Sequence, residues 1–132
     1  MPSLMKGKKG LVIGVANERS IAWGIAKVLA EHGADIAITY QTESLKKRVL
    51  PLAESIGSKL VLPADVQEEQ SLVKVFDELK SEWGKLDFLV HAIAFSDKVE
   101  LAGDFINTSR PNFLNSLDIS CYSLIDLSRR AA

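Results

Sequence analysis

Four short segments of this chain carry the groups best suited to binding a phosphate-bearing ligand. The first runs from Gly14 to Ser20, between an apolar run and an amphipathic run. Gly14 allows a sharp backbone turn, and Ser20 can cap a helix and offer its hydroxyl to a phosphate. A helix N-terminus there would also present free N–H groups and the positive end of its dipole. A plain turn with a serine cap would have the same sequence, so this segment alone leaves both interpretations open.

The other three segments each follow an expected strand. Gln41 can hydrogen-bond ribose hydroxyls but supplies no cation for a 2′-phosphate, which favours NADH over NADPH. Asp65, followed by Val66, can accept a hydrogen bond from an adenine amino group or form an Asx turn. Small residues in the segment 91–95 would let a flat ring lie close to the backbone. His91 at that strand end is more often a structural hydrogen-bonding residue than an acid or a base.

Other catalytic and metal-binding patterns are missing from the sequence. The two histidines and the single cysteine lie far apart, at His32, His91 and Cys121, so no metal site is expected. The sequence has neither a G-x-S-x-G elbow nor a P-loop. Hydrolase and kinase functions therefore have no support.

Composition places the chain among cytoplasmic globular proteins. Its 132 residues are the size of one domain, and 47% of them are hydrophobic, enough to bury a core. A net charge of −1 with interspersed signs predicts neither a nucleic-acid nor a membrane-surface partner. One cysteine fits a reducing compartment, and no run resembles a signal peptide or a membrane span.

Hydrophobic spacing predicts strands and helices in strict alternation. Strands are expected at 10–14, 35–40, 59–63 and 86–92, the last buried on both faces. Helices are expected at 20–32, 45–56 and 72–83, with Pro51 kinking the second or shifting its start. A last helix from Thr108 or Ser109 would carry on its inner face Phe113, Leu117, Cys121 and Leu124. This order indicates an α/β fold, a Rossmann-like doubly wound parallel sheet with ligands at the carboxyl ends of its strands.

Four strands would form an incomplete sheet, with an exposed edge where a fifth strand normally pairs. We therefore expect residues 1–132 to be the N-terminal portion of a single dinucleotide-binding domain.

The turn Gly14-x5-Ser20-Ile21-Ala22-x-Gly24 resembles the divergent cofactor turn of bacterial enoyl-acyl-carrier-protein reductases. These enzymes belong to the short-chain dehydrogenase/reductase superfamily. The similarity continues through 39–41, 65–66, 87–91 and 118–120, and it covers about the first half of the family's usual length. It implies a homotetramer that uses NADH to reduce trans-2-enoyl thioesters, carried by acyl carrier protein, in fatty-acid synthesis.

The resemblance also implies roles for individual residues. The pyrophosphate turn would include Gly14, Ser20 and Ile21, the adenine ribose would lie by Gln41, and adenine by Asp65 and Val66. Ile93 would lie near the nicotinamide ribose. Ser96 would contact the acyl substrate. Ala94 and Ser96 depart from the glycine and alanine that the family often has there.

The family's catalytic residues, a tyrosine and a lysine with six residues between them, are expected beyond the fourth helix. Tyr40 is not expected to serve as that tyrosine, and Tyr122 is expected to pack on the last helix. We therefore assign no catalytic residue and expect no turnover from this chain alone. Another short-chain dehydrogenase and a non-catalytic NAD-binding module remain alternatives. The sequence Ala92-Ile93-Ala94, in place of Asn-Ala-Gly, argues against the first of them.

Overall fold

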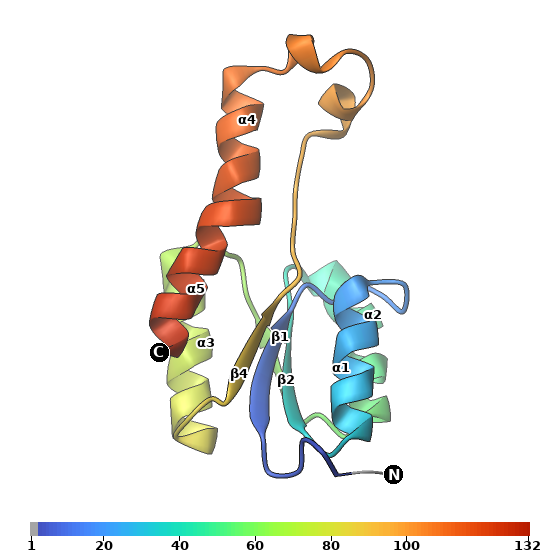
Figure 1. Cartoon of the computed structure of the whole chain (residues 1–132), viewed down its shortest axis with the longest axis vertical. Helices are drawn as coiled ribbons and strands as arrows, with labels where there is room; N and C mark the ends of the chain where they lie inside the picture. The colour runs from blue at the N-terminus through green and yellow to red at the C-terminus, as the bar shows by residue number, and fades with distance from the viewer. Residues whose placement is uncertain (1–2) are drawn as a thin grey trace.

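A parallel four-stranded sheet forms the centre of the molecule, in a computed structural model that describes residues 3–132 (Figure 1). The strand order is β3-β2-β1-β4. The strands are β1 Lys9–Ile13, β2 Asp35–Tyr40, β3 Leu60–Pro63 and β4 Phe88–His91. The four predicted strands and the Rossmann-like α/β fold are confirmed.

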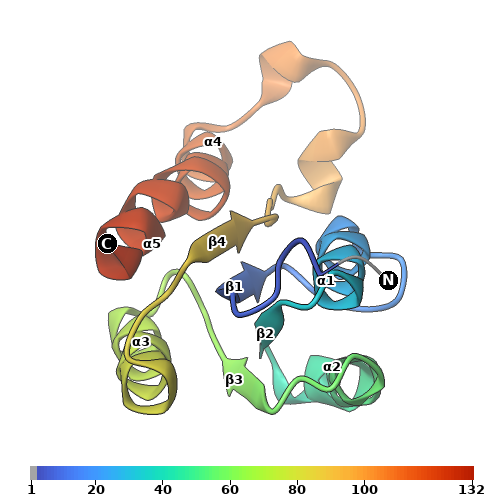
Figure 2. The same ribbon diagram turned by 60° about the horizontal axis from the view of Figure 1, so that its bottom comes forward.

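Helices cover both faces of the sheet. These helices are α1 Ile21–Glu31, α2 Glu43–Ser55, α3 Glu69–Trp83 and α5 Ser123–Ala131, and a further helix, α4 Arg110–Leu117, lies beyond the sheet (Figure 1). A π-helical turn, Asp118–Tyr122, joins α4 to α5. Figure 2 shows α1 and α2 on one face of the sheet, with α3 and α5 on the other. The helix α2 continues through Pro51, so this proline does not end it.

Two hydrophobic cores lie on the two faces because successive side chains of a strand point to opposite sides. Val12 of β1 belongs to the core beneath α1 and α2. Its neighbours Leu11 and Ile13 belong to the other core, which Leu127 of α5 completes. Burial on both faces leaves the ends of the strands as the accessible part of the sheet.

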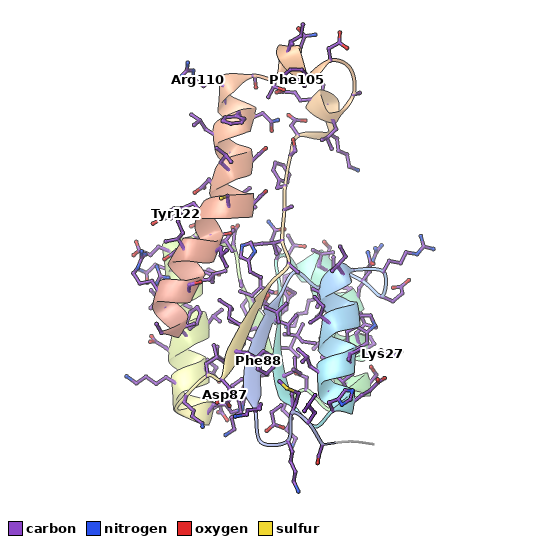
Figure 3. The ribbon with its side chains drawn as sticks, in the orientation of Figure 1. Lys27, Asp87, Phe88, Phe105, Arg110 and Tyr122 are labelled. Atoms are coloured by element: carbon purple, nitrogen blue, oxygen red, sulfur yellow. The ribbon has the colours of Figure 1, made fainter. Side chains whose placement is uncertain are left out.

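The amino end of β4, where Figure 3 labels Asp87 and Phe88, contacts the start of β1. The Lys9 N–H donates a hydrogen bond to the Asp87 carboxylate at 2.9 Å, and this is the main reason that the pKa of Asp87 lies below its ordinary value of 3.8. The ring of Phe88 lies over Gly10, where an added Cβ would come within 1.9 Å of a ring carbon.

The prediction that the fourth strand is buried on both faces is wrong. All four residues of β4 are partly exposed. Among the described residues β4 pairs only with β1 and forms an edge of the sheet, so one side of the strand lacks a neighbour.

The last helix also differs from its prediction. The residues expected on its inner face are exposed, namely Phe113, Leu117, Cys121 and Leu124. The buried positions of α5 are instead Ser123 and Leu127. The inward face of α4 and the π-helical turn is polar and makes hydrogen bonds, and the π-helical turn interrupts the regular spacing on which the prediction depended.

An extended segment, residues 96–109, leads from β4 to α4 and is called the arm below. The arm and α4 project beyond the carboxyl ends of the strands (Figure 1). The arm contains two short 3-10 turns, Lys98–Leu101 and Phe105–Asn107. Phe105 and Arg110 therefore lie far from the sheet (Figure 3).

Candidate functional site

A pocket of about 240 Å³ lies at the carboxyl ends of the strands. This is the edge at which open parallel α/β sheets bind ligands. Four of the residues predicted for cofactor binding line it, one after each strand: Gly14, Gln41, Val66 and Ile93. The fold thus brings together side chains that are distant in the sequence.

Gly14 allows the segments that follow β1 and β4 to touch. Its φ is +121°, a left-handed value that side chains rarely adopt, and an added Cβ would lie 2.0 Å from the carbonyl oxygen of Ala92. The Ala92 N–H donates in turn to the Ile13 carbonyl at 3.0 Å. The absence of a side chain at Gly14 therefore lets the turn after β1 pack directly against the backbone that follows β4.

Ser20 closes the turn before α1 instead of capping the helix with its side chain. Its Oγ accepts hydrogen bonds from the backbone N–H groups of Ala16 and Asn17, at 2.9 and 3.1 Å. No side-chain cap hydrogen bond is formed with α1, so the prediction of a side-chain cap is wrong. The N–H groups of Trp23 and Gly24 donate to the Ser20 carbonyl, which leaves those of Ile21 and Ala22 for an anion and fits a pyrophosphate at this position.

Four predicted residues lie outside the pocket lining, and Ser20 is one of them. Ile21, at the start of α1, is 79% exposed. Asp65 forms the Asx turn that was its alternative interpretation, since its Oδ1 accepts from the Gln67 N–H at 2.9 Å. Ser96 lines a separate hollow in the arm, where its hydroxyl accepts a hydrogen bond from the Asn112 amide at 3.2 Å.

His91 has the structural role that its strand-end position favoured. Its Nε2 lies 2.7 Å from the hydroxyl of Ser123, which is only 2% exposed. This hydrogen bond joins the end of β4 to the start of α5.

Two lining residues were missed by sequence reasoning. Leu45 was assigned only to the apolar stripe of its helix, and it lines the pocket beside Gln41. Ile119 reaches the pocket from the π-helical turn. The segment 118–120 is one of those that resemble the reductase family, although no role was assigned to it. That resemblance is the sequence signal that could have identified Ile119.

Neither tyrosine lines the pocket. Lys47 does follow Tyr40 with six residues between them, so spacing alone does not exclude this pair. Burial excludes it, because Tyr40 is 5% exposed in the core and its ring faces Lys46 Nζ at 5.5 Å. Tyr122, which was expected to pack, is exposed on the last helix (Figure 3).

Metal ligands and membrane-spanning helices are also missing from residues 3–132. No group of three or more histidine, cysteine or acidic side chains there could hold a metal ion. None of the described helices is both long enough and apolar enough to cross a membrane.

Comparison with known sequences identifies relatives along the whole chain. The family model for enoyl-(acyl carrier protein) reductase matches residues 14–132. The NADH enoyl-acyl-carrier-protein reductase 2 of Rhizobium meliloti is 54% identical over 132 residues, which are 100% of this chain and 49% of that protein. The NADH enoyl-acyl-carrier-protein reductase of Rickettsia felis is 53% identical over 128 residues, 97% of this chain and 49% of that protein.

Solved structures of such reductases have the same fold. The Anaplasma phagocytophilum reductase in complex with NAD matches with a TM-score of 0.96 and 54% identity, over 99% of this chain and 50% of that one. The Bacillus cereus reductase with NADP+ and indole naphthyridinone matches with a TM-score of 0.94 and 42% identity, over 99% of this chain and 51% of that one. The chain spans about half the length of the relatives it matches. By sequence and by fold, it belongs to the enoyl-acyl-carrier-protein reductase family.

Proposed function

We propose that residues 1–132 form the N-terminal, cofactor-binding portion of an NADH-dependent enoyl-acyl-carrier-protein reductase. The observation that carries this proposal is the pocket at the carboxyl ends of the strands, to which each strand end contributes a predicted cofactor residue. Membership of the reductase family and the NAD complex of a relative with the same fold support it.

The pocket offers suitable groups for each part of NADH. The N–H groups at the start of α1 would hold the pyrophosphate, and Gly14, Ser20 and Ile21 would form the turn around it. Gln41 would hydrogen-bond the adenine ribose, Asp65 and Val66 would lie by adenine, and Ile93 by the nicotinamide ribose. When bound, NADH would supply the hydride that reduces the enoyl double bond.

The wall formed by Ala92 and Ala94 suits the flat nicotinamide ring. Both side chains are small and both line the pocket, so a ring can approach the backbone closely. Phe95 adds apolar surface at the same wall, which would help to exclude water from the reacting face.

Substrate and assembly complete the proposal. Ser96, next to that wall, would lie near the acyl chain of an enoyl group carried by acyl carrier protein. The exposed apolar side chains of Phe113, Leu117 and Leu124 support burial of α4 and α5 against further protein, as a homotetramer would provide. The proposed location is the cytoplasm, on the composition of the sequence.

Cofactor preference tests the assignment of Gln41. We expect NADH to bind more tightly than NADPH when each is titrated into the chain and its nicotinamide fluorescence is followed, because Gln41 supplies no cation for a 2′-phosphate. The variant Gln41→Arg should move the preference toward NADPH. Tighter binding of NADPH by the unchanged chain would contradict the NADH assignment.

A turnover assay tests the expectation that residues 1–132 bind the cofactor but hold no catalytic residue. We expect residues 1–132 alone not to oxidise NADH in the presence of a trans-2-enoyl thioester, because neither tyrosine lines the pocket. Absorbance of NADH at its nicotinamide band measures this directly. Oxidation at a rate near that of ordinary enzymes would show that the chain already holds a catalytic group. NADH binding that the thioester leaves unchanged would favour a non-catalytic binding module.

A further inference from the structure

The π-helical turn Asp118–Tyr122 lies beside the wall of the pocket that follows β4. Ile119 of this turn lines the pocket directly. Two serines nearby, Ser120 within the turn and Ser123 just after it, form hydrogen bonds with the segment 91–95. Helical turns of this kind are rare and are frequently found at functional sites.

Ser120 holds one end of that segment. Its Oγ accepts a hydrogen bond from the Phe95 N–H at 2.9 Å and donates one to the Phe95 carbonyl at 3.3 Å. A single hydroxyl therefore satisfies both backbone groups of Phe95, which uses its capacity as donor and as acceptor.

Ser123 holds the other end. Its hydroxyl lies 2.6 Å from the Ile119 carbonyl, to which it donates, and 2.7 Å from His91 Nε2. Because the hydroxyl hydrogen is directed to Ile119, the imidazole Nε2–H is the donor in the second hydrogen bond. His91 is the last residue of β4, so this contact fixes the point at which the segment leaves the sheet.

Ala92, Ile93 and Ala94 lie between these two points, outside regular secondary structure, and all three line the pocket. We propose that Ser120 and Ser123 clamp this wall at both ends, and that Ser120 is a positioning residue for the cofactor. The proposal rests on the proposed function, because the wall matters only if the cofactor lies against it. If the wall is already ordered before the cofactor binds, binding does not carry the conformational entropy cost of ordering it.

The test compares Ser120→Ala with Cys121→Ala in the same chain. Cys121 is the next residue in the turn and is exposed, so its variant is a matched control for the turn itself. We expect Ser120→Ala to weaken NADH binding about tenfold, as the loss of a hydrogen-bonded anchor would, and Cys121→Ala to leave it unchanged. Ser120→Thr restores a hydroxyl and should recover most of the affinity.

The amide resonance of Phe95 gives a readout that needs no ligand. In nitrogen-15 spectra of the free chain, we expect it to shift and to exchange faster in Ser120→Ala, and to remain in place in Cys121→Ala. Ser123→Ala is a second variant, in which release of the His91 end should also weaken NADH binding.

Each outcome has one meaning. If the unchanged chain fails to bind NADH, the proposed function fails and this inference falls with it. If the unchanged chain binds NADH and Ser120→Ala binds it equally well, the inference alone is overturned. A Phe95 resonance that does not respond to Ser120→Ala would also overturn it.

Discussion

At the scale of single residues, Gly14 is the position at which the geometry of the site is least tolerant of change. A side chain here would be forced into a left-handed φ of +121°. Its Cβ would also lie 2.0 Å from the Ala92 carbonyl oxygen. We expect Gly14→Ala to lower the free energy of unfolding by about 2–5 kcal/mol, from backbone strain plus overpacking. Urea unfolding followed by circular dichroism measures this change.

Two other glycines provide the controls for that experiment. Gly57 has a φ of +71° with open space around it, so Gly57→Ala should cost only the strain, about 1–2 kcal/mol. Gly24 lies within α1, also with open space, and Gly24→Ala should stabilise the chain by about 0.5–1 kcal/mol. A Gly14→Ala variant no less stable than Gly57→Ala would show that the approach to Ala92 imposes no cost.

The site residues that could be predicted from the sequence are those that follow a strand. Gly14, Gln41, Val66 and Ile93 each lie one to three residues after the end of a strand, and parallel strands place such positions at one edge. Ile119 could not be predicted in this way, because it reaches the pocket from a helical turn. The role of Ser20 was missed for a different reason. A serine before a helix indicates a side-chain cap by local rules, and only the folded turn shows that its hydroxyl faces Ala16 and Asn17.

At the scale of elements, hydrophobic spacing matches the inner face of α3 but not that of α1, where Ile21 and Val28 are exposed and the buried residues are Ala22, Trp23 and Ala26. The helix α3 buries Leu72, Val75 and Leu79, a spacing that predicts its inner face. The inner face of α4 and the π-helical turn makes polar contacts instead, through side chains such as Asn112 and Ser120. Hydrophobic spacing carries no information about such a face, so the prediction placed the wrong side of this helix inward.

Within the arm, the Glu100 carboxylate accepts pH-dependent hydrogen bonds from Ser109, the residue that precedes α4. The Ser109 hydroxyl and N–H both donate to Glu100, each at 2.6 Å, and they hold the pKa of Glu100 below its ordinary value of 4.5. Because the folded-state pKa is lowered, this stabilisation is present above pH 4.5 and is lost as the pH falls through the folded pKa. We expect the Ser109 amide resonance to titrate with a midpoint below 4.5.

The variant Glu100→Gln is the control for this titration, because it removes the ionisable group and keeps the size of the side chain. The Ser109 resonance should then stay constant over the same pH range. A midpoint at or above 4.5 in the unchanged chain would contradict the inferred hydrogen bonds to Ser109.

At the scale of the whole molecule, the two ends of the sheet have different roles. The amino ends of β1 and β4 are fixed by contacts such as that between Lys9 and Asp87, and they surround no cofactor residue. The carboxyl ends open into the pocket, and the arm and α4 project beyond them (Figure 1). We propose that NADH binds at the carboxyl ends of the strands.

Nitrogen-15 spectra of the chain during an NADH titration test that claim most directly. We predict the largest shifts at residues lining the pocket, including Gly14, Gln41 and Ile93, with Lys9 and Phe88 at the opposite end unchanged. Shifts concentrated at the amino ends of the strands, or no shifts at saturating NADH, would contradict it.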